Sequence, residues 1–105
     1  KLIAQIRKAS EKSGEKVWQL PLWPEYEQMI KGKHGDIKNI GEPSEAGTIT
    51  AAWFLKEFIG DWPWAHIDIA GTAYQTGPYA KSYMGWGATG AGVRLAAQFL
   101  IDNAG

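Results

Sequence analysis

The sequence of 105 residues has no cysteine and no net charge. Without cysteine, neither a disulfide bond nor a thiolate metal site can form. Lysine and arginine together number 11, as do aspartate and glutamate, so no strong field attracts nucleic acid or an anionic membrane. No apolar run approaches the ~20 residues of a membrane-spanning helix. We therefore expect one small domain with neither nucleic acid nor a membrane as its partner.

Sequence signatures of catalysis are scarce as well. The chain has no Gly-x-Ser-x-Gly nucleophile elbow. Gly85–Gly90 matches the Gly-x-Gly-x-x-Gly pattern of dinucleotide-binding loops, but such a site requires a strand directly before it, and here a long loop precedes it. We interpret these glycines as a flexible lead into the last helix.

The most regular pattern lies at residues 64–73. From Trp64 to Ala70, side chains alternate between a wholly apolar face and a face that carries His66 and Asp68. This alternation predicts a strand buried on both faces. In open α/β sheets, ligands bind beyond the carboxyl end of such a strand, which here is Gly71–Ala73.

His66 and Asp68 lie on the same face of this predicted strand, so both could point into one site. Metal ligation, or a base with its orienting acid, is one interpretation. The alternative is a structural histidine, with Asp68 capping the turn that follows. His34 is the only other histidine, so a metal site cannot be completed from these residues, and we favour the structural alternative.

The rest of the sequence is rich in predicted helices. Apolar spacing and stop signals predict helices at residues 2–13, 25–31, 46–59 and 89–103. The alternating residues 36–40 predict a short edge strand, and residues 74–87 are predicted to form a long loop. This order predicts an α/β fold that is helix-rich with two clear strands.

These helices present more apolar surface than a two-stranded sheet can cover. In the last helix, the stripe predicted to be buried consists of Val93, Ala96, Ala97, Leu100 and Ile101. The first residues already follow an amphipathic pattern, with neither an initiator methionine nor a signal-like apolar run. We therefore expect the chain to be part of a larger domain.

Six tryptophans are spread along the chain. We interpret them as core and interface anchors. The alternative is an aromatic surface that stacks on sugar rings; burial of the tryptophans would exclude it.

Several short motifs occur together in one order and spacing. They are Val17–Trp23, Asn39–Gly41, Ala46–Ala52, Phe54–Phe58, Trp64–Ala73, Gly87–Gly90 and Val93–Leu95. In this combination they resemble the C-terminal part of the catalytic domain of the leucyl (cytosol) aminopeptidase family. The resemblance covers essentially the whole chain.

The resemblance implies a cytoplasmic hydrolase, a two-metal aminopeptidase that removes N-terminal residues such as leucine from peptides. Zinc or manganese ions would polarise the scissile carbonyl and supply the attacking water. The family's catalytic domain is a three-layer α/β/α arrangement with a mixed sheet, assembled as a homo-hexamer. Its remainder would supply the strands that residues 1–105 lack.

The family's metal ligands are lysine, aspartate and glutamate, several of them in an Asn-Thr-Asp-Ala-Glu-Gly-Arg stretch that also holds the catalytic arginine. This stretch is absent from the sequence, and the family places it upstream of Lys1. The resemblance therefore implies neither a catalytic residue nor a metal ligand in this chain, and we expect the chain alone to be inactive.

What the resemblance does imply is a wall of the substrate pocket. Ala70 and Ala73 match positions that line the pocket for the substrate's first side chain, with Gly71 and Thr72 between them. The loop around Gly47-Thr48 lies near that pocket in the family. The alternative function is a non-catalytic interaction or assembly module derived from the same fold, which would associate through its exposed apolar helices.

Overall fold

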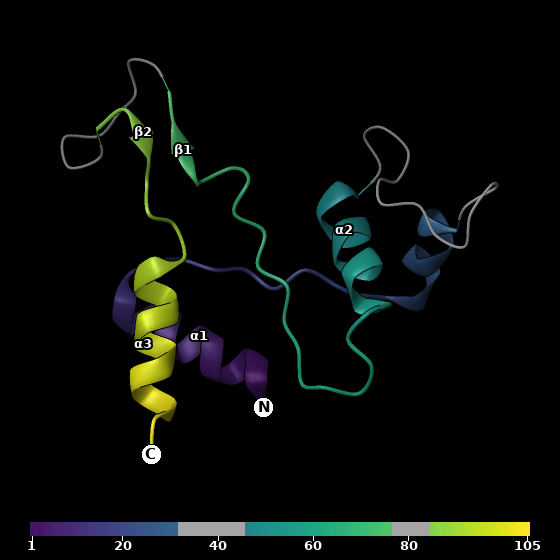
Figure 1. The fold of residues 1–105 in the computed structure, drawn as a ribbon, viewed down its shortest axis with the longest axis horizontal. Coiled ribbons are helices and arrows are strands. Elements are labelled where there is room, and N and C mark those ends of the chain that lie inside the picture. Colours follow the sequence, from purple (N-terminus) through teal and green to yellow (C-terminus); the bar gives the residue numbers. More distant parts are fainter. Residues whose placement is uncertain (32–45, 77–84) are drawn as a thin grey trace. The chain divides into compact units, whose positions relative to one another are not determined.

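The computed structural model describes residues 1–31, 46–76 and 85–105 (Figure 1). Their contacts divide the chain into two compact units. The first unit contains Lys1–Val17 and Ile67–Gly105, and the second contains Trp18–His66. Each unit is described here by itself.

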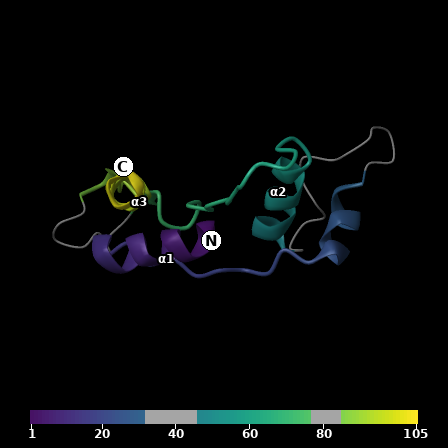
Figure 2. The same ribbon diagram turned by 90° about the horizontal axis from the view of Figure 1, so that it is seen from below.

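The first unit consists of two helices and a small sheet. Helix α1 (Leu2–Ser13) and helix α3 (Val93–Asn103) lie side by side and cross (Figures 1 and 2). Strands β1 (Tyr74–Gln75) and β2 (Gly87–Ala88) form an antiparallel pair, in which Tyr74 lies opposite Ala88. The sequence predicted a loop at residues 74–87, but its first two residues form β1 and its last residue forms β2 together with Ala88, so the prediction is wrong at both ends of this segment.

Helix α1 has the bounds that the sequence predicts. Its apolar residues recur at helical spacing, and Ala9 is completely buried. The helix ends at Gly14, whose φ of 75° is left-handed and whose N–H donates to the Ser10 carbonyl over 3.0 Å. Because a side chain disfavours this backbone conformation, glycine is the residue that ends such a helix most readily.

Helix α3 differs from its prediction in its start and in its buried face. It begins at Val93 rather than near Thr89, because Gly90 and Gly92 adopt left-handed φ values of 73° and 90°. The prediction of a buried stripe is wrong for all five of its members, since Ala96 and Ala97 are exposed and so are the three larger residues, Val93 at 66%, Leu100 at 64% and Ile101 at 70%. Leu95 is buried instead, at 3%.

The physical reason is that α1 is the helix packed against α3 in the described part of this unit. It covers the side of α3 that carries Leu95, and the polar residue Asp102 on the same side contacts Lys12 of α1. No sheet among the described residues covers the opposite, apolar side of α3. The most apolar stripe of an amphipathic helix is buried only where a second layer is present.

The second unit packs a short 3₁₀ helix, η1 (Pro24–Ile30), against helix α2 (Gly47–Lys56). Ile30, Ala52 and Trp53 are buried between them. The Trp53 indole N–H donates to the Trp23 carbonyl over 3.0 Å. Both helices were predicted, but α2 ends three residues earlier than residue 59.

The predicted strand at residues 64–70 is not formed. Residues 64–69 have no regular secondary structure, and no strand in the described ranges pairs with them. Alternation specifies which side chains share a face, whereas a strand also requires a neighbour for its backbone N–H and C=O groups. The other predicted strand, at residues 36–40, lies outside the described residues.

Most tryptophans for which burial is described are not in a core. Trp53 is buried, as the interpretation of the tryptophans as core anchors predicts. Trp18, Trp62 and Trp86 are largely exposed, with Trp18 at 89%, so they are not core residues of this chain, and their role as interface anchors stays a prediction. Within the described ranges, no helix has the length and apolar character needed to cross a membrane.

Candidate functional site

The predicted pocket-wall residues form a tight turn in the first unit, which begins directly after Ile69. The N–H groups of Thr72 and Ala73 both donate to the Ile69 carbonyl, over 2.9 and 2.8 Å. The Thr72 hydroxyl also donates to this carbonyl, over 3.3 Å. The turn is therefore closed by its own backbone, and Ala70 and Gly71 are exposed on it.

Asp68 accepts a hydrogen bond at the start of this turn. Its Oδ1 accepts a hydrogen bond from the Ala70 N–H over 2.9 Å. This is the turn-capping role that the structural alternative predicts for Asp68, with Ala70 as the donor. The ring of His66 lies 6.2 Å from that of Trp64, centroid to centroid.

The turn is joined to the segment before α3 by a residue that the sequence had placed in the last helix. The Thr89 N–H donates to the Ala73 carbonyl over 2.9 Å, and the Thr89 hydroxyl donates to the Thr72 carbonyl over 2.5 Å. The glycines Gly90 and Gly92 were the available signal that the helix starts after Thr89.

The start of α3 is capped by a carboxylate from the other end of the chain. Glu15 accepts hydrogen bonds from the N–H groups of Gly92, over 3.1 Å, and Leu95, over 2.7 Å. These are the two amide donors that a capping box satisfies, but neither residue has a side chain that could do so. Sequence reasoning missed Glu15 because a cap from a distant segment leaves no local pattern.

The second predicted pocket segment, Gly47-Thr48, is the first turn of α2 in the second unit. The Thr50 hydroxyl donates to the Gly47 carbonyl over 3.1 Å. Ala46, directly before it, has a φ of 41°, and it is the only non-glycine residue with a positive φ in the described part of the chain. Such a backbone costs an alanine about 1 kcal/mol or more.

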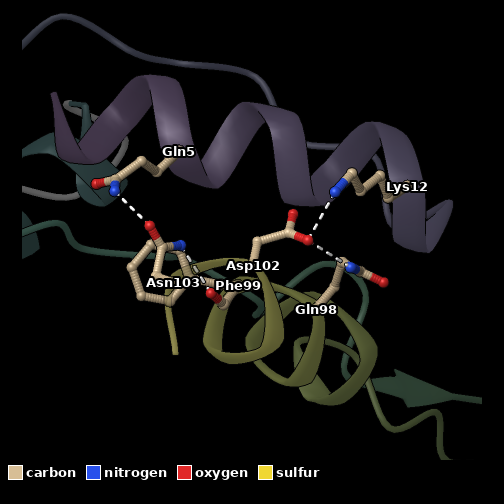
Figure 3. A network of polar contacts seen from close by, with 6 residues as sticks. All are labelled: Gln5, Lys12, Gln98, Phe99, Asp102 and Asn103. Atoms are coloured by element: carbon tan, nitrogen blue, oxygen red, sulfur yellow. Dashed lines mark hydrogen bonds and ion pairs between the residues drawn. The ribbon is translucent and has the colours of Figure 1, made fainter. Parts of the chain in front are cut away.

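Polar contacts connect α1 with α3 (Figure 3). The Lys12 ammonium lies 2.6 Å from Asp102 Oδ1, which also accepts a hydrogen bond from the Gln98 amide over 2.9 Å. The hydrogen bond from Lys12 holds the pKa of Asp102 below its ordinary value of 3.8. About two turns before Lys12 in α1, the Gln5 amide donates to the side chain of Asn103, the residue that follows Asp102 (Figure 3).

A metal ion has no suitable ligands in the described ranges. No group of three or more histidine, cysteine, aspartate or glutamate side chains lies close enough there to hold one. Zinc and manganese sites need such sets of ligands. The described residues therefore do not fit a metal centre.

The structure defines an α/β chain that presents a turn of small residues joined by hydrogen bonds to Thr89. The family model for the catalytic domain of the cytosol aminopeptidase family matches residues 1–97. The chain is 50% identical over 99 residues to a probable cytosol aminopeptidase of Geobacter sulfurreducens. The matched region covers 94% of this chain and 19% of that protein. It is 53% identical over 101 residues to a probable cytosol aminopeptidase of Cenarchaeum symbiosum, covering 95% of this chain and 21% of that protein.

A probable cytosol aminopeptidase of Roseiflexus castenholzii is 50% identical over 101 residues, with 96% of this chain and 20% of that protein covered. The chain therefore belongs to the cytosol aminopeptidase family. This confirms the resemblance seen in the sequence motifs and, with it, the α/β fold class. The chain spans about a fifth of the length of the curated relatives it matches.

Proposed function

We propose that this chain is the C-terminal portion of the catalytic domain of a leucyl aminopeptidase, which as a whole hydrolyses N-terminal residues from peptides. The observation that supports it most strongly is the family match over residues 1–97 at about half identity to named aminopeptidases. The proposed enzyme uses two divalent ions, zinc or manganese, held by residues outside this sequence. Because the described residues do not fit a metal, we assign no catalytic step to them.

The proposed role of this chain is to form one wall of the pocket for the substrate's first side chain. Ala70 to Ala73 suit that role because alanine and glycine leave space and because hydrogen bonds fix the turn. Gly47-Thr48 is proposed to lie near the same pocket. Concave, largely apolar surfaces with fixed backbone are typical of such pockets.

The exposed stripe of α3 supports the proposal that the chain is part of a larger domain. Val93, Leu100 and Ile101 present contiguous apolar surface at helical spacing. Burying such side chains is worth about 1.5–3 kcal/mol each. We propose that the remainder of the catalytic domain covers this stripe, and that the complete enzyme is a cytoplasmic homo-hexamer.

Activity of the parent protein against that of the isolated chain tests this function. The full-length gene product that contains this sequence, loaded with zinc or manganese, is expected to release leucine from leucine p-nitroanilide. The isolated chain, purified in the same way, is expected to release none. Chelation should abolish the activity of the parent, and the added metal should restore it. Metal-dependent leucine release by the isolated chain would contradict the proposal.

A parent without aminopeptidase activity would favour the non-catalytic module. The exposed apolar surface of α3 is the observation on which that second function rests. In that case the isolated chain is expected to self-associate or to bind a partner through this stripe, which sedimentation of the chain and of a Leu100→Asp variant would show.

A further inference from the structure

Thr89 contacts the proposed pocket wall through both its backbone and its side chain. Its N–H donates to the Ala73 carbonyl over 2.9 Å, and its hydroxyl donates to the Thr72 carbonyl over 2.5 Å. The same hydroxyl oxygen accepts a hydrogen bond from the Ala91 N–H over 3.2 Å. One side chain thus fixes a carbonyl of the turn and the backbone that leads into α3.

The backbone contact of Thr89 continues the small sheet. Tyr74 lies opposite Ala88 in the β1–β2 register, so the next antiparallel pair is Ala73 with Thr89. Gly90 follows with a φ of 73°, which turns the chain away from the sheet. Thr89 is therefore the last residue of this segment that lies opposite the turn. Its hydroxyl donates to the carbonyl of Thr72, the residue before Ala73.

The segment after Thr89 is fixed at its other end by Glu15. This carboxylate accepts the N–H groups of Gly92 and Leu95, and the Ser10 hydroxyl donates to the Glu15 carbonyl over 2.6 Å. Hydrogen bonds thus run from α1 through Glu15 to the start of α3, and from Thr89 to the turn. The turn is thus held by hydrogen bonds from Thr89 in addition to its own bonds to the Ile69 carbonyl.

We infer that Thr89 is a positioning residue for the substrate pocket: it fixes the carbonyls of Thr72 and Ala73, and with them the wall that receives the substrate's first side chain. The inference rests on the proposed function, in which this turn forms that wall. Thr89 itself touches no reacting atom in this role. Its effect is therefore expected on substrate affinity and on side-chain preference rather than on the rate of bond cleavage.

Two substitutions separate the hydroxyl from the shape of the side chain. Thr89→Val keeps the β-branched shape and the backbone N–H but removes the hydroxyl, so the Thr72 carbonyl loses its donor. Thr89→Ser keeps the hydroxyl and serves as the matched control. Because the bond to Thr72 is exposed, its loss is expected to change affinity by only about two- to fivefold.

The experiment measures kcat and KM of the full-length, metal-loaded enzyme with leucine p-nitroanilide and glycine p-nitroanilide. Glycine has no side chain to place against the wall. Thr89→Val is expected to raise KM for the leucyl substrate about two- to fivefold, with kcat for both substrates and KM for the glycyl substrate unchanged. Thr89→Ser is expected to match the wild type. Unchanged KM values, or equal losses with both substrates, would overturn the inference.

Ala73→Leu separates this inference from the proposed function, since it fills the wall directly. If Ala73→Leu changes the preference for the leucyl over the glycyl substrate and Thr89→Val does not, the turn still forms the pocket wall, but the positioning role of Thr89 is wrong. If neither changes it, or the wild type does not cleave the leucyl substrate, the proposed function itself fails. Circular dichroism checks folding, and Thr89→Ala is assayed if Thr89→Val does not fold. If Thr89→Val and Thr89→Ala both misfold while Thr89→Ser folds, the hydroxyl is needed for folding itself, and the positioning role is overturned.

Discussion

Removing the Glu15 carboxylate should loosen the start of α3. Glu15 accepts the N–H groups of Gly92 and Leu95, and no other side chain in the described residues caps this helix. Loss of a capping side chain costs about 0.5–2 kcal/mol. Because Glu15 serves two donors and places a negative charge at the positive end of the helix, we expect a cost of about 1–2 kcal/mol for Glu15→Ala.

Amide hydrogen exchange measures this cost where it arises. If the helix start opens locally, the Leu95 amide should exchange about 5 to 30 times faster in Glu15→Ala than in the wild type. Glu15→Gln keeps one acceptor and loses the charge, so it should lie between the two. The assay is NMR-detected exchange at a single pH and temperature.

Glu11→Gln is the matched control, because Glu11 is exposed on α1. It removes the same charge four positions earlier and should leave exchange at Leu95 unchanged. The reasoning would be refuted if Leu95 exchanged at the wild-type rate in Glu15→Ala. It would also be refuted if Glu11→Gln accelerated exchange as much, since a change in net charge would then be the cause.

Three further predictions concern the ends and faces of the helices. Gly14→Ala should lower the free energy of unfolding by about 1 kcal/mol in a denaturant titration, because φ is 75° there although the space is open. The pKa of Asp102 should rise toward 3.8 in a carbon-13 NMR titration of Lys12→Met, because the hydrogen bond that lowers it is removed. Since the pKa in the folded state is lowered, the contact contributes its full stabilisation of the folded state above pH 3.8. That stabilisation is lost as the pH falls through the pKa of the folded state. Leu100→Asp should change the free energy of unfolding of the isolated chain by less than about 0.5 kcal/mol, because Leu100 is exposed, yet lower the soluble yield of the full-length protein.

The parts of the fold that were predicted correctly depend on neighbours in the sequence. Helix α1 and its end at Gly14 follow from spacing and from the backbone freedom of glycine. The strand predicted at residues 64–70 was not formed, because alternation reports the faces of a strand and not the presence of a pairing partner. The start of α3 was misplaced because the prediction placed Gly90 and Gly92 inside the helix at residues 89–103, whereas both glycines adopt a left-handed φ before it begins.

The candidate site divides in the same way. The break of the chain at Gly71–Ala73 was predicted and the structure has a turn there, and Asp68 caps this turn as the structural alternative required. Its role as a pocket wall stays a prediction. Neither Glu15 nor Thr89 was predicted, since each acts on residues far from it in the sequence.

The sequence by itself determined the local helices and, through the order and spacing of its motifs, membership of the cytosol aminopeptidase family. Only the tertiary structure decided that α3 buries Leu95 against α1 while its apolar stripe stays exposed. It also decided that Glu15 and Thr89 fix the start of α3 and the turn. The physical reason is that spacing along a chain sets which side chains share a face, whereas burial depends on which other element packs there.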